Sequence, residues 1–186
     1  MNPLEMELAP SRTAGTSPVD WSAWVPTEAA TLMFVFDDAG RVLLIHKKRG
    51  MGAGLINGPG GRLEPGETPL QAAVRETQEE LRVTALDPEF RGTLQFDMGD
   101  GYNLLGFVFA ANRHAGIPTE TDEATPEWFP ADALPLDRMW EDDRVWTPWM
   151  LQRRRFLGRF SFLRDRLRWY SIDDDFGPDP SGVPRP

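Results

Sequence analysis

The amino-acid sequence predicts a single-domain sandwich of the α+β class. First, 186 residues are enough for one domain with a real core and too few for two comfortable ones. Second, an apolar content of 40% and an aromatic content of 11% are typical of globular rather than disordered proteins. Third, strand-like segments stand on both sides of one strongly helical segment, and a second helical segment follows late in the chain, which favours an α+β sandwich.

The two ends of the chain differ in composition from the part between them. Residues 1–18 are rich in proline, serine and threonine and predict a flexible tail, as do residues 174–186. The folded domain is therefore expected to span residues 19–173. At its start, the tryptophans of VDWSAWVP (19–26) could pack across the domain as an arm.

A β-hairpin is predicted at the beginning of the core. Two apolar runs rich in branched and aromatic residues, TLMFVF (31–36) and RVLLIH (41–46), flank an Asp-Asp-Ala-Gly turn, and this pattern is typical of a hairpin. A glycine-dense loop, RGMGAGLINGPGG (49–61), follows.

The next segment, TPLQAAVRETQEELRV, predicts a helix. Thr68 can cap its N-terminus, Pro69 suits the first turn, and Gln71 completes a capping box. Apolar or small residues keep the helical period and predict the buried stripe; they are Leu70, Ala73, Val74, Thr77 and Leu81.

The second half of the chain predicts more strands and one more helix. GTLQFDM (92–98) and NLLGFVFA (103–110) predict a second hairpin, and EWF (127–129) predicts a short strand. A helix is expected over residues 143–157. The last predicted element is a terminal hairpin, formed by GRFSFL (158–163) and RLRWYSI (166–172).

Three carboxylates crowd one face of the first predicted helix. Glu76, Glu79 and Glu80 stand at i, i+3 and i+4, so they lie within about 6 Å of each other and cost the helix roughly 0.2–0.5 kcal/mol per pair. Because they lie away from the apolar stripe, we expect all three to face outward, toward the glycine loop. Clustered carboxylate oxygens suit a hard divalent cation such as Mg²⁺ or Mn²⁺. The alternative is an ordinary solvated face.

The spacing of residues 61–83, G-x5-E-x7-R-E-T-x-E-E-x-R-V, resembles the signature of the Nudix hydrolase family. Seven positions match the signature: Gly61, Glu67, Arg75, Glu76, Glu79, Glu80 and Val83. Thr77 replaces an aliphatic residue, and Arg82 replaces a glycine. The resemblance implies an α/β/α sandwich with a mixed sheet, a central catalytic helix and a C-terminal helix.

The resemblance also implies roles for these residues. Glu76, Glu79 and Glu80 would bind Mg²⁺ or Mn²⁺ together with the carbonyl of Gly60. One of these helix acids, or another acid nearby, would accept a proton from the attacking water. Glu67 and Arg75 would pair and brace the loop against the helix.

Two segments, KKRGMGAGLINGPGG and MWEDDRVWTPWMLQRRRFLGRFSF, are similar to the branch of the family that hydrolyses oxidised purine nucleoside triphosphates. The similarity extends over residues 31–172 and implies that Glu123 is a further metal ligand. Met51 and Ile56 stand where the best-known members have aromatic residues. The implied substrate-binding residues are Lys47, Met51, Asn57, Trp140, Asp142 and Asp143.

The Asp142–Asp143 pair is chemically suited to a purine edge. Two adjacent carboxylates cannot both ionise cheaply, so one pKa rises and a proton is shared between them. Such a pair donates one hydrogen bond and accepts another. The alternative is an exposed N-terminal cap on the following helix.

The expected function is Mg²⁺-dependent hydrolysis of oxidised purine nucleoside triphosphates such as 8-oxo-dGTP to monophosphate and pyrophosphate. The alternatives are hydrolysis of a nucleoside diphosphate, nucleotide sugar or dinucleotide, and a weakly catalytic nucleotide- or RNA-binding module. The net charge of −9 argues against a general nucleic-acid binder, and the arginines at 153–155 suggest a solvated face. No 18-residue apolar run, signal-like start or cysteine occurs, so we expect a cytoplasmic protein without membrane contact. The expected assembly is a monomer or a homodimer.

Overall fold

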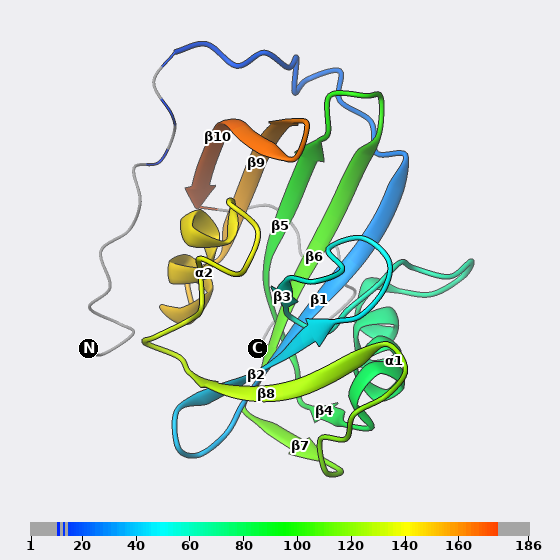
Figure 1. The fold of residues 1–186 in the computed structure, drawn as a ribbon. Coiled ribbons are helices and arrows are strands. Elements are labelled where there is room, and N and C mark those ends of the chain that lie inside the picture. Colours follow the sequence, from blue (N-terminus) through cyan, green and yellow to red (C-terminus); the bar gives the residue numbers. More distant parts are fainter. Residues whose placement is uncertain (1–10, 12, 14, 175–186) are drawn as a thin grey trace.

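A mixed β-sheet forms the centre of the computed structural model, which describes residues 11, 13 and 15–174 (Figure 1). The strands run in the order β10-β9-β5-β6-β1-β2-β3, and β8 pairs with β2 beside this path. β1 and β6 are parallel, as are β5 and β9, and the other pairs are antiparallel. The strands of this sheet are β1 (Glu28–Phe36), β2 (Arg41–Lys47), β3 (Ile56–Asn57), β5 (Glu89–Asp97), β6 (Asn103–Ala111), β8 (Ala124–Pro130), β9 (Phe156–Leu163) and β10 (Arg166–Asp174). A separate small sheet pairs β4 (Thr84–Leu86) with β7 (Arg113–Ala115).

Two helices cover opposite faces of the main sheet, α1 (Pro69–Leu81) on one and α2 (Asp143–Leu151) on the other (Figure 1). Side chains alternate between the faces along a strand. In β1, Met33 and Val35 therefore join the core beneath α1, whereas Phe34 joins the core beneath α2 and contacts Trp146. This arrangement confirms the α/β/α sandwich.

α1 begins as the sequence predicts. Thr68 and Gln71 form the reciprocal capping box, with Pro69 in the first turn. Of the expected stripe, Ala73, Thr77 and Leu81 are buried, while Leu70 and Val74 are half-buried. The Thr77 hydroxyl donates to the Ala73 carbonyl at 2.7 Å, so it is satisfied inside the core.

The C-terminus of α1 is strained. Arg82 stands at the C-cap with φ of 60°, in the left-handed region that costs a non-glycine residue about 1–2 kcal/mol. The departure of Arg82 from the family signature therefore falls at a position that favours glycine.

The second half of the chain differs from prediction in two places. The second helix ends at Leu151 instead of residue 157, because Arg153 adopts a left-handed φ of 56° and the chain enters β9 at Phe156, beside Gly92 of β5. β8 is longer than the predicted 127–129 and contains prolines, which fit because it pairs with β2 alone. The terminal hairpin is confirmed by β9 and β10.

Residues before β1 pack on the far edge of the sheet. The ring of Trp21 stacks on Trp169 of β10 at 6.1 Å, as expected for an arm. Part of the predicted tail at 1–18 also contacts β10, because the Thr13 amide donates to the Tyr170 carbonyl at 3.0 Å and the Ser11 carbonyl accepts from β10. The rest of that tail before residue 15 lies outside the described residues, as do residues 175–186 of the predicted C-terminal tail. Among the described residues, the helices are too short and polar to cross a bilayer.

Candidate active site

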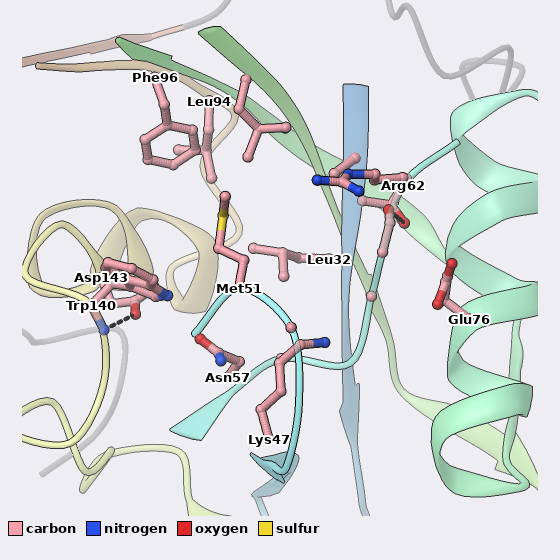
Figure 2. A pocket seen from close by; sticks show the side chains of 18 of the residues that line it. Leu32, Lys47, Met51, Asn57, Arg62, Glu76, Leu94, Phe96, Trp140 and Asp143 are labelled. Carbon is pink, nitrogen blue, oxygen red and sulfur yellow. Dashed lines mark hydrogen bonds between the residues drawn. The ribbon is translucent and has the colours of Figure 1, made fainter. Parts of the chain in front are cut away.

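A cavity of about 540 Å³ extends from the segment before α2, across the sheet, to the acidic face of α1. Figure 2 shows Trp140 and Asp143 at one end, Arg62 and Glu76 at the other, and Met51 and Leu32 between them. Besides these, the lining includes Lys47, Asn57, Gly60, Gly61, Glu80, Leu94, Phe96, Met98, Tyr102, Leu104, Gly106, Glu123, Asp142, Trp146 and Phe162.

The acidic end of the cavity is built on α1. Glu80 is only 1% exposed, and its two oxygens are each bound: Lys47 Nζ donates to Oε1 at 3.0 Å, and the Gly60 backbone N–H donates to Oε2 at 2.9 Å. Glu80 therefore faces the glycine loop, as expected, but the expectation that it lies on an outward, exposed face is wrong. Its burial is tolerated because a cation and a backbone amide satisfy the carboxylate.

Glu76 and Glu79 differ from Glu80 in exposure. The side chain of Glu76 is 16% exposed and that of Glu79 is 55% exposed. Gly61 lies so close to Glu76 that an added Cβ would stand 2.4 Å from the carboxyl carbon. The glycine at this position thus lets the loop backbone pack against the acidic face of the helix.

Arg75 ties the acidic face together. Its Nε and Nη2 donate to the two oxygens of Glu67 at 2.7 and 3.0 Å, so the pair expected from the sequence forms. Nη1 donates to Glu76 at 2.8 Å and to Glu79 at 3.1 Å, and Nη2 also reaches the Arg62 carbonyl. The hydrogen bonds from Arg75 are the largest cause that lowers the pKa of Glu67 to about 2. The loop before α1 is thereby fixed to the helix.

The pKa values at this end show crowded negative charge. Burial raises the pKa of both Glu76 and Glu80, and the neighbouring carboxylates raise them further. Arg75 opposes the shift at Glu76, and Lys47 and the Gly60 amide oppose it at Glu80. The site therefore stabilises added positive charge.

This donor set fits a divalent cation, since carboxylate and carbonyl oxygens are the ligands that Mg²⁺ and Mn²⁺ prefer. Within residues 11, 13 and 15–174, no three His, Cys, Asp or Glu side chains converge around one point. The carboxylates bind Arg75, Lys47 and, for Glu123, Arg49. A divalent ion would be bound once it replaced these Arg and Lys side chains as the partner of the carboxylates.

The other end of the cavity carries two buried carboxylates. Asp142 and Asp143 are each 5% exposed. The Trp146 indole N–H donates to Asp142 at 2.9 Å, and the Trp140 backbone N–H donates to Asp143 at 2.9 Å. Burial raises the pKa of Asp142 to about 6. Burial, and then the charge of Asp142, raise the pKa of Asp143 well above its usual range.

These contacts rule out the alternative of an exposed helix cap. Asp142 does occupy the N-cap position of α2. Within Asp143–Leu151, which the structure describes in full, no backbone amide donates a hydrogen bond to its carboxylate. The pair is instead enclosed in the cavity wall, where it can hold a proton near neutral pH and both donate and accept a hydrogen bond.

The remaining predicted site residues all line the cavity. Lys47, Asn57, Trp140 and Glu123 are joined by Met51, which stands at the rim with 47% of its surface exposed. Ile56 is buried in the core under α2 and contributes no side chain to the cavity lining.

The sequence reasoning missed the floor of the cavity. Leu94, Phe96 and Met98 line it from β5 and the residue after it, at every second position of a strand. That alternation was the available signal, but it does not reveal which face of the strand meets the cavity. Arg62, Tyr102 and Phe162 were missed as well.

The arrangement can hold a flat, apolar ligand with a polar edge at one end and an anionic, metal-bound group at the other.

A model of the NUDIX domain matches residues 26–150. The chain is 46% identical over 124 residues to the oxidized purine nucleoside triphosphate hydrolase of Danio rerio, covering 66% of this chain and 80% of that protein. It is 39% identical over 134 residues to the protein of the same name from Mus musculus, covering 71% and 86%. The crystal structure of a MutT protein from Bacillus halodurans is similar with a TM-score of 0.71 and 29% identity, over 78% of this chain and 97% of that chain.

Proposed function

The chain belongs to the Nudix family. We propose that it hydrolyses oxidised purine nucleoside triphosphates such as 8-oxo-dGTP to the monophosphate and pyrophosphate. The observation that carries this proposal is a single cavity with Glu76 and Glu80 at one end and Trp140, Asp142 and Asp143 at the other. The names of the Danio rerio and Mus musculus relatives support the same substrate class.

Nudix hydrolases generally use divalent metal ions, and we propose Mg²⁺, with Mn²⁺ as a substitute. Glu76, Glu79 and Glu80 would hold the ion with the Gly60 carbonyl and Glu123. When bound, the ion neutralises phosphate charge and lowers the pKa of a coordinated water. Arg75 keeps the helix acids in place through its bonds to Glu67, Glu76 and Glu79.

Lys47 and the aspartate pair are assigned to substrate binding. The ammonium of Lys47 lies against Glu80 at the cavity wall, where it can bind a phosphate oxygen once the carboxylate has another cation. At the other end, Asn57 and Trp140 would contact the purine. A proton held by the Asp142–Asp143 pair would supply the donor, and its remaining oxygens the acceptor, that a purine edge requires.

The net charge of −9 supports a small nucleotide rather than a nucleic acid as substrate. Because nucleoside triphosphates form an intracellular pool, the proposal also places the enzyme in the cytoplasm.

The decisive experiment identifies the product as well as the substrate. The purified chain is incubated with 8-oxo-dGTP, dGTP, 8-oxo-dGDP and a nucleotide sugar, each with Mg²⁺ and with excess chelator, and the release of pyrophosphate and phosphate is measured. We expect metal-dependent release of pyrophosphate, with the highest kcat/KM for 8-oxo-dGTP. Turnover of the nucleotide sugar alone, or no turnover with Mg²⁺, would contradict the proposal.

A further inference from the structure

The loop between β2 and β3 folds tightly over the rim of the cavity. The Gly54 amide donates to the Lys47 carbonyl at 2.8 Å, and the Leu55 amide donates to the Gly52 carbonyl at 2.9 Å. These bonds hold Met51 above the space between the two ends of the cavity (Figure 2). The conformation of the loop is therefore set by backbone hydrogen bonds within it and to the end of β2.

Gly52 brings the loop backbone directly against two of the residues assigned to the base. A Cβ added at Gly52 would stand 2.9 Å from Nδ2 of Asn57 and 3.1 Å from Nε1 of Trp140. Ordinary contacts between such atoms are about 3.5–4.0 Å. The absence of a side chain at this one position lets the loop, the amide and the indole share the cavity wall.

We propose that Gly52 is a positioning residue for base recognition, which acts through Asn57 and Trp140. The inference rests on the proposed function, in which these two side chains contact the purine. A side chain at position 52 would force either the loop or the two base-contacting groups to move.

Asn57 and Trp140 differ in how freely they can move. The Asn57 amide is the end of a flexible side chain and can rotate, which would turn its donor and acceptor away from a bound base. The Trp140 indole is more constrained, because its own backbone N–H binds Asp143 at 2.9 Å and its ring packs edge-on against Phe162.

The loop is not packed tightly on every side. A second cavity of about 550 Å³ is lined by Met51, Ala53, Leu55 and Met139, among others, and it shares Gly50, Met51 and Trp140 with the first. An adjustment of the loop would first move Met51, which is 47% exposed, and not a buried core side chain. A substitution at Gly52 is therefore expected to damage recognition more than folding.

The chain offers a matched control for the strain of the backbone. Gly52 and Gly54 both have left-handed φ values, 78° and 88°, so Gly52→Ala and Gly54→Ala strain the loop similarly. Around a Cβ at Gly54, however, no described atom lies within 4 Å. Any difference between the two variants then reports the contact with Asn57 and Trp140.

The test compares the two alanine variants in binding and in turnover. For Gly52→Ala we expect about a tenfold rise in KM for 8-oxo-dGTP, the change produced by loss of roughly one hydrogen bond, with kcat changed far less. Binding of 8-oxo-dGMP without metal, measured by calorimetry, should weaken by a similar factor, while inhibition by pyrophosphate should be unchanged. The KM and the 8-oxo-dGMP affinity of Gly54→Ala should stay near the wild-type values. The melting temperatures of both variants should fall by similar amounts.

A double-mutant cycle shows whether Gly52 acts through Asn57. In the Asn57→Ala background, Gly52→Ala should raise KM clearly less than in the wild type, because residues in contact are non-additive. Equal effects of Gly52→Ala and Gly54→Ala, or full additivity with Asn57→Ala, would overturn the inference. A failure of the proposed function would look different, because the wild-type chain would then turn over no oxidised purine triphosphate. In that case the affinities of Gly52→Ala and Gly54→Ala for 8-oxo-dGMP still test the inference.

Discussion

Replacing Asp142 with asparagine removes one of two adjacent buried carboxylates with almost no change in shape. Asp142 is 5% exposed and accepts a hydrogen bond from the Trp146 indole at 2.9 Å. An asparagine Oδ1 can accept the same bond, so the packing around Trp146 should be kept. The change therefore removes a buried charge and, with it, the repulsion that raises the pKa of Asp143.

The cost follows from the pKa of Asp142, which burial raises from 3.8 to about 6. Below pH 3.8 the group is protonated in both the folded and the unfolded chain and contributes nothing. As the pH rises from 3.8 to about 6, the unfolded chain loses the proton first, so stability falls. At about 1.36 kcal/mol per pH unit, the full penalty above pH 6 is about 3 kcal/mol.

Asp142→Asn should therefore be more stable than the wild type at pH 7.5 by about 3 kcal/mol or more, because it also removes the charge that raises the pKa of Asp143, and nearly equal to it at pH 4. Denaturant unfolding followed by fluorescence from pH 4 to pH 8 measures this difference. Asp137→Asn, which removes a carboxylate from an exposed position in the preceding loop, is the control and should leave the pH dependence unchanged.

Parallel stability curves for Asp142→Asn and the wild type would refute the reasoning about burial. The same variant should reduce the ratio of kcat/KM for 8-oxo-dGTP to that for dGTP, because an amide cannot share a proton with Asp143. Its Mg²⁺ dependence should stay near wild type, since the glutamates are untouched.

Three further substitutions test the helix and its acids. Arg75→Ala should lower the free energy of unfolding by about 2–3 kcal/mol. The Arg75 side chain is 23% exposed, so its loss should cost less than breaking a fully buried ion pair and more than breaking an exposed one. An unchanged melting temperature would show that the bond to Glu67 does not stabilise the fold. Glu80→Gln should lower turnover at limiting Mg²⁺ at least about tenfold, equivalent to about 1.4 kcal/mol, and should leave the fold intact. The control Glu64→Gln, in the exposed loop before α1, should not lower turnover. Wild-type rates of Glu80→Gln at low Mg²⁺ would argue against Glu80 as a metal ligand. Arg82→Gly should stabilise the chain by about 1 kcal/mol by relieving the left-handed φ of 60°, and Arg82→Ala should not.

The sequence alone determined the features of the chain that depend on neighbouring residues. The capping box of Thr68 and Gln71 and the grouping of Glu76, Glu79 and Glu80 follow from helical spacing, which is local. Apolar runs on either side of turn residues likewise predicted the hairpins, and the resemblance to the family implied the α/β/α layers. The family signature added the expected partners Glu67 and Arg75, which lie eight residues apart.

Tertiary structure alone decided how the groups at the site are buried and which of them meet. Glu80 is buried because its partners come from Gly60 and Lys47, 20 and 33 residues away, and helical spacing carries no information on such contacts. The cavity floor at Phe96 and the closeness of Gly52 to Trp140 depend on how strands and loops pack. Burial and the pKa shifts that it causes are properties of the assembled surroundings, so they cannot be obtained from the order of residues along one segment.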